Sequence, residues 1–145
     1  MNKGDLAREN FKTGRNCAQA VLLAFKDDLN ISEHELEKLI IGFGGGFARQ
    51  RYVCGAVSGM TAVLGSILSD GKDKLKIYQI VKEAMDMFSK QTGSVICSDL
   101  LDGQTLQDKS TTPEERTEQY YKKRPCAELC ALAGEITEKL IKKYK

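Results

Sequence analysis

The sequence predicts an all-α protein, a compact helical bundle of about five to seven helices around a central, uncharged, glycine-rich helix at about residues 53–68. Apolar residues recur at spacings of three and four along almost the whole chain, and no stretch shows sustained alternation of apolar and polar residues. Capping residues and glycines divide this pattern into segments of helical length. Because 145 residues suffice to bury a core, we expect one helical domain that spans 1–145.

Two short helices are expected first. One covers about residues 2–12 and stops at Gly14, since glycine readily adopts the left-handed conformation that follows many helix ends. Asn16 is suited to cap a second helix at about residues 17–25, because its side-chain oxygen can accept a hydrogen bond from a free backbone N–H group. The two helices should form a bent pair.

A third helix and a glycine-rich turn follow. Ser32 and Glu35 form an S-x-x-E capping box, and the helix that it opens should end at Gly42. The side chains expected to be buried along this helix are Leu36, Leu39 and Ile40. The glycine-rich stretch 42–47 predicts a turn with positive φ angles or a very close backbone approach.

The central helix lies in a segment, residues 52–69, that carries no charged residue. Its glycines and serines dilute its hydrophobicity, and neither end has an aromatic belt or an excess of positive charge, so we expect a buried core helix and no membrane insertion. Gly55 and Gly59 lie four residues apart on one face, where the backbone of a neighbouring helix can approach closely.

The C-terminal half continues with helices. Asp70 is expected to cap a long amphipathic helix at about residues 72–90. The side chains of this helix that we expect to be buried are Leu75, Tyr78, Val81, Met85 and Phe88. The polar segment 102–111 should be a surface loop. A capping box with proline, at residues 112–115, predicts a restart of helix, and Pro125 should open the last helix.

Composition excludes several classes of function. The chain has 22 Lys and Arg against 20 Asp and Glu, and this small excess is spread evenly along the chain, so we expect no binding to nucleic acid. The first ten residues alternate charges and lack the apolar stretch of a signal peptide, which predicts a cytoplasmic protein. Five cysteines are far fewer than the roughly 8–10% of a disulfide-stapled scaffold, and cytoplasmic thiols stay reduced unless they are catalytic, redox-sensing or bound to metal.

Four of the cysteines share one position in the predicted structure. Each follows a capping residue, a glycine turn or a proline, so each should lie near the start of a helix; they are Cys17, Cys54, Cys97 and Cys126. No C-x-x-C pair is present, which argues against a thioredoxin-type redox pair, zinc-finger spacing and c-type haem attachment. These four cysteines can meet only through the fold.

A helix start favours thiolate over thiol, because unpaired N–H groups and the positive end of the helix dipole lie there. Arg15, Arg51 and Arg124 precede three of the four cysteines by two or three residues and should add to this effect. The same setting suits an anionic iron–sulfur cluster with thiolate ligands. Cys130 lies one helical turn after Cys126, beside apolar residues, and is interpreted as core packing.

The segment Cys54-Gly55-Ala56-Val57-Ser58-Gly59, with Cys17 upstream and Cys97 and Cys126 downstream, resembles the C_GCAxxG_C_C family of bacterial and archaeal proteins to which redox activity is attributed. The resemblance covers most of the chain, including the glycine turn at 44–46. It implies a small, mostly helical protein with four key cysteines, an unidentified redox partner and a functional link to a transporter.

The family is also similar to the non-haem part of split-Soret cytochromes, which are dimers whose cysteines are thought to hold an iron–sulfur centre. The haem attachment sites of those proteins are missing here, so the resemblance implies no haem and, as the first expectation, a two-iron two-sulfur cluster on Cys17, Cys54, Cys97 and Cys126. A homodimer is compatible with the resemblance, although the small-residue face of the central helix can equally be used within the monomer.

Three hypotheses therefore remain open. In the first, the four cysteines are cluster ligands in an electron carrier or redox sensor. In the second, the protein is a cluster-free thiol–disulfide oxidoreductase, with Cys54 and Cys17 as candidate catalytic thiols. In the third, the four thiolates bind zinc in a non-catalytic structural or partner-binding module, which the lack of a C-x-x-C pair disfavours.

Overall fold

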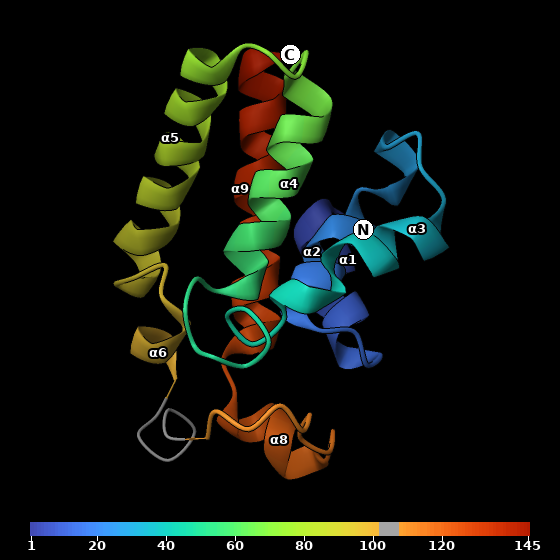
Figure 1. The fold of residues 1–145 in the computed structure, drawn as a ribbon, viewed down its shortest axis with the longest axis vertical. Coiled ribbons are helices and arrows are strands. Elements are labelled where there is room, and N and C mark those ends of the chain that lie inside the picture. The colour runs from blue at the N-terminus through green and yellow to red at the C-terminus, as the bar shows by residue number, and fades with distance from the viewer. Residues whose placement is uncertain (102–107) are drawn as a thin grey trace.

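The computed structural model describes residues 1–101 and 108–145, and it confirms the all-α fold (Figure 1). Its helices are α1 (Lys3–Lys12), α2 (Cys17–Ala24), α3 (Glu33–Ile40), α4 (Gly55–Leu68), α5 (Lys74–Thr92), α6 (Cys97–Leu100), α8 (Glu118–Lys123) and α9 (Cys126–Tyr144). Short 3₁₀ turns follow α2 and α3. In the described ranges the helices outnumber the expected five to seven, because the short α6 and α8 are separate elements.

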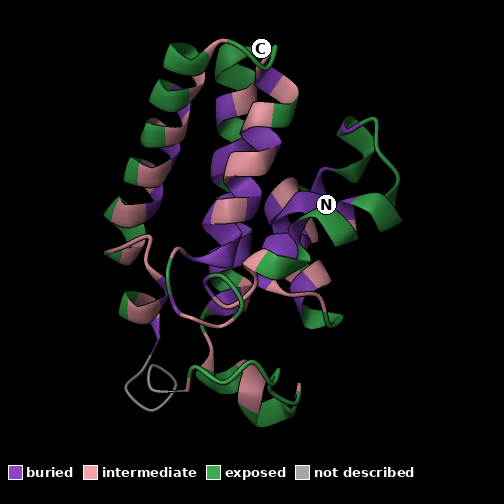
Figure 2. Ribbon diagram, viewed as in Figure 1, coloured by how far each residue is buried: buried purple, intermediate pink, exposed green. Residues whose placement is uncertain are grey.

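The long helices α4, α5 and α9 run side by side, α1 and α2 pack against one flank of this group, and α3 packs on α2 (Figure 1). The core lies where α4 and α9 meet α1 and α2, whereas α5 covers the outside with one buried edge (Figure 2). The starts of α4 and α9 point toward the same end of the bundle, close to the glycine-rich loop and α8 (Figure 1). This end of the bundle is therefore where residues at helix starts can gather.

Of the predicted N-terminal caps, those of Asn16 and Ser32 are confirmed and that of Asp70 is wrong. The Asp70 side chain accepts from the Lys72 and Asp73 N–H groups in the turn before α5, which begins only at Lys74. The side chains of Asn16 and Ser32 each accept a hydrogen bond from the backbone N–H three residues later, and Asn16 forms a full reciprocal capping box with Gln19. Pro125 directly precedes α9, as expected. These contacts are local, which explains why the sequence alone predicted them.

The predicted buried face of α5 is partly wrong. Leu75 and Tyr78 are 73% and 66% exposed, and the buried residues are Ile80, Ala84 and Phe88. In α3, Leu39 is 62% exposed although its side chain was expected to be buried. Both helices lie at the periphery, where a neighbour covers only a narrow strip, so part of each apolar face stays exposed.

The helix expected to begin at residues 112–115 is absent: this segment is irregular, and α8 begins only at Glu118, capped by Thr117. The backbone and side chain of Ser110 bind Arg49, and Arg116 bonds to the backbone of α1 and its following loop, so tertiary contacts hold the chain extended. Of the predicted surface loop 102–111, residues 108–111 are non-helical, and the rest lie outside the described residues.

The close approach predicted for the central helix is confirmed. A Cβ atom on Gly59 would lie 2.7 Å from the carbonyl oxygen of Ala18, and one on Gly55 would lie 3.1 Å from the backbone nitrogen of Ala18. The backbones of α2 and α4 therefore touch at the small-residue face. The helix is buried among α2, α5 and α9, and none of the described helices is long and apolar enough to span a membrane.

The glycine-rich loop forms a left-handed turn. Gly45 and Gly46 have φ angles of 67° and 72°, and positive φ continues through Phe47, Ala48 and Arg49. Non-glycine residues rarely adopt this conformation, which costs roughly 1–2 kcal/mol per residue. A hydrogen bond from the Tyr52 N–H to the Gly46 carbonyl (2.9 Å) closes the turn.

Replacing Ala48 by glycine is expected to raise the free energy of unfolding by up to about 1 kcal/mol, because Ala48 is exposed and glycine removes the left-handed strain at φ 52°. Urea denaturation of both proteins measures this difference. The same substitution at Ala62, inside α4, should instead lower stability by about 1 kcal/mol. Destabilisation of both variants would contradict the assignment of strain to the loop.

Candidate functional site

The four predicted site cysteines all lie at helix starts. Cys17, Cys97 and Cys126 are the first residues of α2, α6 and α9, and Cys54 immediately precedes α4. Every one of them is buried, between 4% and 9% exposed. The position that the sequence predicted for them is confirmed.

The fold brings these four cysteines to the wall of one cavity of about 50 Å³. Residues on either side of Cys54 and Cys97 form an isolated antiparallel bridge between Val53 and Ile96. The Cys54 N–H donates to the Val95 carbonyl (2.8 Å), and the Cys97 N–H donates to the Tyr52 carbonyl (2.6 Å). This bridge fixes two cysteines from segments far apart in the sequence next to each other.

Cys17 and Cys126 form the other half of the cavity wall, because α2 packs against α9. The two thiols act on each other's pKa: Cys126 lowers that of Cys17, and Cys17 raises that of Cys126. Cys130 lies one turn further along α9, is completely buried, and directs its thiol to the Cys17 carbonyl at 3.8 Å. It does not line the cavity, which agrees with its interpretation as a packing residue.

Burial dominates the acid–base behaviour of the thiols. It raises the pKa of Cys54 to about 12, although the Ala56 and Val57 N–H groups at the start of α4 act in the opposite direction. The neighbouring Cys17 thiol, together with burial, raises the pKa of Cys126 well above its ordinary value. The predicted low-pKa thiolates are therefore wrong for the protein without a bound cation, because desolvation outweighs the helix start.

Two of the three arginines predicted to act on the cysteines do so. Arg51, only 3% exposed, and Arg124 line the cavity, and both oppose the rise in the pKa of Cys97 that burial causes. Arg15 does not line the cavity: it pairs with Glu33 at 3.0 Å and Glu37 at 3.5 Å.

The sequence interpretation missed Arg116 and Tyr120, which also line the cavity. The guanidinium of Arg116 lies 4.9 Å from the Tyr120 ring centroid, and that of Arg124 lies 5.0 Å from the same ring. Arg116 lies in the irregular segment before α8 and Arg124 directly follows this helix, so no helical spacing in the sequence could have grouped them with Tyr120. Burial raises the pKa of Tyr120 to about 12, so its phenol stays protonated.

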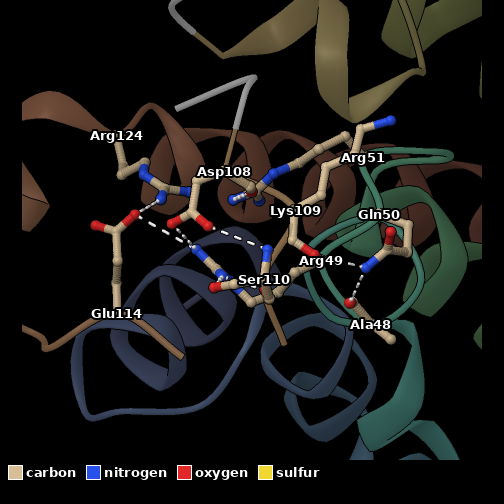
Figure 3. A network of polar contacts seen from close by, with 9 residues as sticks. All are labelled: Ala48, Arg49, Gln50, Arg51, Asp108, Lys109, Ser110, Glu114 and Arg124. Carbon is tan, nitrogen blue, oxygen red and sulfur yellow. Dashed lines mark hydrogen bonds and ion pairs between the residues drawn. The ribbon is translucent and has the colours of Figure 1, made fainter. Parts of the chain in front are cut away.

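A second layer of polar contacts surrounds the arginines (Figure 3). Glu114 pairs with Arg124 and lies 3.6 Å from Arg49, which also pairs with Asp108 at 3.1 Å. Arg49 holds the pKa of Asp108 down at about 2, so this carboxylate is ionised at neutral pH. The network ties the loop after α3 to the irregular segment that leads to α8.

The cysteine cavity offers four thiols as ligands for a bound metal centre, but these thiols are not yet arranged around a common point. Over residues 1–101 and 108–145, no three His, Cys, Asp or Glu side chains are arranged to hold a metal ion. The thiols would have to converge across the cavity, from helix starts that are themselves fixed by backbone hydrogen bonds. The three lining arginines, of which Arg124 also pairs with Glu114, would offset part of the negative charge of four thiolates.

Comparison with known proteins agrees with this site. The family described as "Putative redox-active protein (C_GCAxxG_C_C)" matches residues 15–140, a range that includes all four cavity cysteines. An uncharacterized protein from the archaeon Archaeoglobus fulgidus is 31% identical over 144 residues, covering 90% of this chain and 87% of that protein. No solved structure matches the chain. The chain therefore belongs to the C_GCAxxG_C_C family.

Proposed function

We propose that Cys17, Cys54, Cys97 and Cys126 are the ligands of an iron–sulfur centre, with a two-iron two-sulfur cluster as the first expectation, and that the protein carries electrons or senses redox state. The single observation that carries this proposal is the gathering of four cysteines, from four helix starts, around one buried cavity. Iron–sulfur clusters are typically held by four cysteine thiolates, and such a centre supplies one-electron redox chemistry when it is bound.

The surroundings of the cavity support an anionic centre. Arg51, Arg116 and Arg124 line it, and their positive charges would stabilise four thiolates that burial otherwise keeps protonated. The Ala56 and Val57 N–H groups at the start of α4 lower the pKa of Cys54, and such groups would also stabilise its sulfur as a ligand. Burial would also keep water away from the centre, and solvent exposure is one determinant of its reduction potential.

Anaerobic purification, with iron and acid-labile sulfide assayed on the same sample before and after cluster reconstitution, tests the proposal. We expect a brown protein with equal iron and sulfide. Alanine at Cys17, Cys54, Cys97 or Cys126 should lower bound iron at least tenfold, because each removes one ligand. Cys130→Ala is the matched control and should retain iron, because this thiol does not line the cavity.

A second candidate function rests on Cys17 and Cys126, which line the same small cavity and act on each other's pKa. In this alternative the two thiols pass two electrons and two protons to an external disulfide, which leaves as two thiols while a Cys17–Cys126 disulfide forms. A colourless protein that stays free of iron after reconstitution, and whose Cys17 and Cys126 become linked in oxidised glutathione, would replace the cluster by this chemistry. Tight zinc in place of iron would instead indicate a structural metal site.

A further inference from the structure

A second cavity of about 460 Å³ adjoins the cysteine cavity. We call it the vestibule; Asn16, Gly45, Arg51, Arg116, Tyr120 and Arg124 line both spaces. Its size falls in the range of about 300–1,000 Å³ that is typical of small-molecule sites. The vestibule therefore offers a small molecule access to the side of the cysteine cavity.

The vestibule is strongly positive. Four arginines line it, at positions 49, 51, 116 and 124, whereas Glu114 is the one carboxylate among its lining residues in the described part of the chain. Glu114 and Asp108 pair with Arg49 and Arg124 (Figure 3). These two carboxylates neutralise two of the four guanidinium groups, so two positive charges remain.

The two remaining charges belong to Arg51 and Arg116, which have no carboxylate partner among the described residues. Arg51 is only 3% exposed. Its Nη2 donates a hydrogen bond to the Asp108 carbonyl at 3.2 Å, and its Nε has no hydrogen-bond partner among the described residues. A buried charge with an unused donor is costly unless a counter-charge arrives. Because Arg51 lines both cavities, thiolates on one side or an anion in the vestibule on the other can supply that counter-charge.

Arg116 is held in place before any ligand binds. Its two terminal nitrogens donate to the Phe11 and Arg15 carbonyls, each at 2.9 Å, and its guanidinium lies 4.3 Å from the Phe11 ring centroid. A guanidinium fixed in this way is suited to a carboxylate or phosphate group, because its planar donors match their oxygens. Preorganisation also reduces the entropy lost on binding.

Apolar side chains line the rest of the vestibule. Ile41 and Pro113 face it together with the Tyr120 ring, and Ile41 is 59% exposed in the protein alone. An inorganic ion would leave these side chains uncovered, whereas an organic anion would cover them. The lining thus combines a charged end near the cysteines with an apolar wall.

We propose that the vestibule binds a small organic anion, a molecule with a phosphate or carboxylate group, and that Arg51 and Arg116 hold the anionic group beside the cysteine cavity. The inference names the ligand class of the proposed redox site, and it rests on that proposed function only for the role of the ligand. Binding itself needs the arginines and the apolar wall, not a cluster.

Isothermal titration with inorganic phosphate, phenyl phosphate and benzoate, at constant ionic strength set by chloride, tests the inference. We expect phenyl phosphate or benzoate to bind with a dissociation constant of about 1 mM or lower, and phenyl phosphate to bind at least tenfold more tightly than inorganic phosphate. Whichever organic probe binds more tightly identifies phosphate or carboxylate as the preferred group. Failure of both organic probes to bind would overturn the inference.

Charge-conserving variants locate the binding. Arg51→Lys and Arg116→Lys should each weaken binding of the tighter probe at least tenfold, because lysine lacks the planar pair of donors. Arg8→Lys is the matched control, since Arg8 pairs with Asp5 and Glu128 and does not line the vestibule. Thermal unfolding of each variant separates loss of binding from loss of the fold, and equal affinity in all three variants would contradict the proposed site.

Cys54→Ala separates this inference from the proposed function. We expect it to lose iron yet to bind the anion within about threefold of the unaltered protein, because Cys54 does not line the vestibule. If the unaltered protein binds iron but neither organic probe, the cluster proposal stands and the ligand inference fails. If the unaltered protein binds a probe but no iron, the ligand inference stands and the cluster proposal fails. If anion binding disappears with the cluster, the arginines serve the centre alone and the inference is overturned.

Discussion

Replacing Gly46 by alanine is expected to lower the free energy of unfolding by about 3 kcal/mol or more and to abolish the binding of iron at the cysteine cavity. Two effects add at this position. Gly46 has a φ of 72°, which disfavours any residue with a Cβ atom, and that atom would lie 2.6 Å from the Tyr52 backbone nitrogen and 2.8 Å from the Cys97 Cβ. The loop would have to move away from the segment that holds Cys97.

Gly71→Ala is the matched control for this experiment. Gly71 also has a positive φ, 90°, but an added Cβ would meet nothing within 4 Å. Its cost should therefore be only the conformational part, about 1–2 kcal/mol, with iron content unchanged. Urea denaturation and iron per chain measure both variants, and similar losses in the two would show that the contact with Cys97 has no energetic role.

Replacing Gly59 by alanine is the second substitution for which we expect a large effect, a loss of about 1–3 kcal/mol. The added Cβ would lie 2.7 Å from the Ala18 carbonyl oxygen and 3.0 Å from the Val21 Cβ, so α2 and α4 would have to separate. Cys17 begins α2 and Cys54 precedes α4, so the separation should also lower the iron bound per chain.

The control for Gly59 lies in the same helix. Gly65 is inside α4, and a Cβ there would meet nothing within 4 Å. Gly65→Ala should raise the free energy of unfolding by about 1 kcal/mol, because alanine is the better helix former. The two alanine variants should thus differ in sign, as measured by urea denaturation. A gain in stability at both positions would show that the two helix backbones are not in close contact.

The site could be predicted in part because its cysteines are marked by local signals. Asn16, the glycine turn before Cys54 and Pro125 all announce a helix start within a few residues of a cysteine. The acid–base state of the thiols could not be predicted in the same way. The pKa of Cys54 rises to about 12 through burial, and burial depends on the segments that the fold packs around it.

The arginines illustrate the same limit. Arg15 and Arg51 both stand close before a cysteine in the sequence, yet Arg15 pairs with α3 and Arg51 lines the cavity. Arg116 is distant in sequence from Cys17 and Cys54 and nevertheless lines the cavity with them. Proximity along the chain therefore predicted the position of Arg51 correctly and that of Arg15 wrongly.

By itself, the sequence determined the all-α class, the capped starts of α2 and α3, the start of α9 after Pro125, and the close approach of a neighbouring helix backbone to α4, because caps and glycine faces act within one or two helical turns. Only the tertiary structure decided which side of α5 is buried, that the chain before α8 stays irregular, and that three arginines converge on the cysteine cavity. Those outcomes depend on contacts between segments far apart in the chain, and no local signal encodes such contacts.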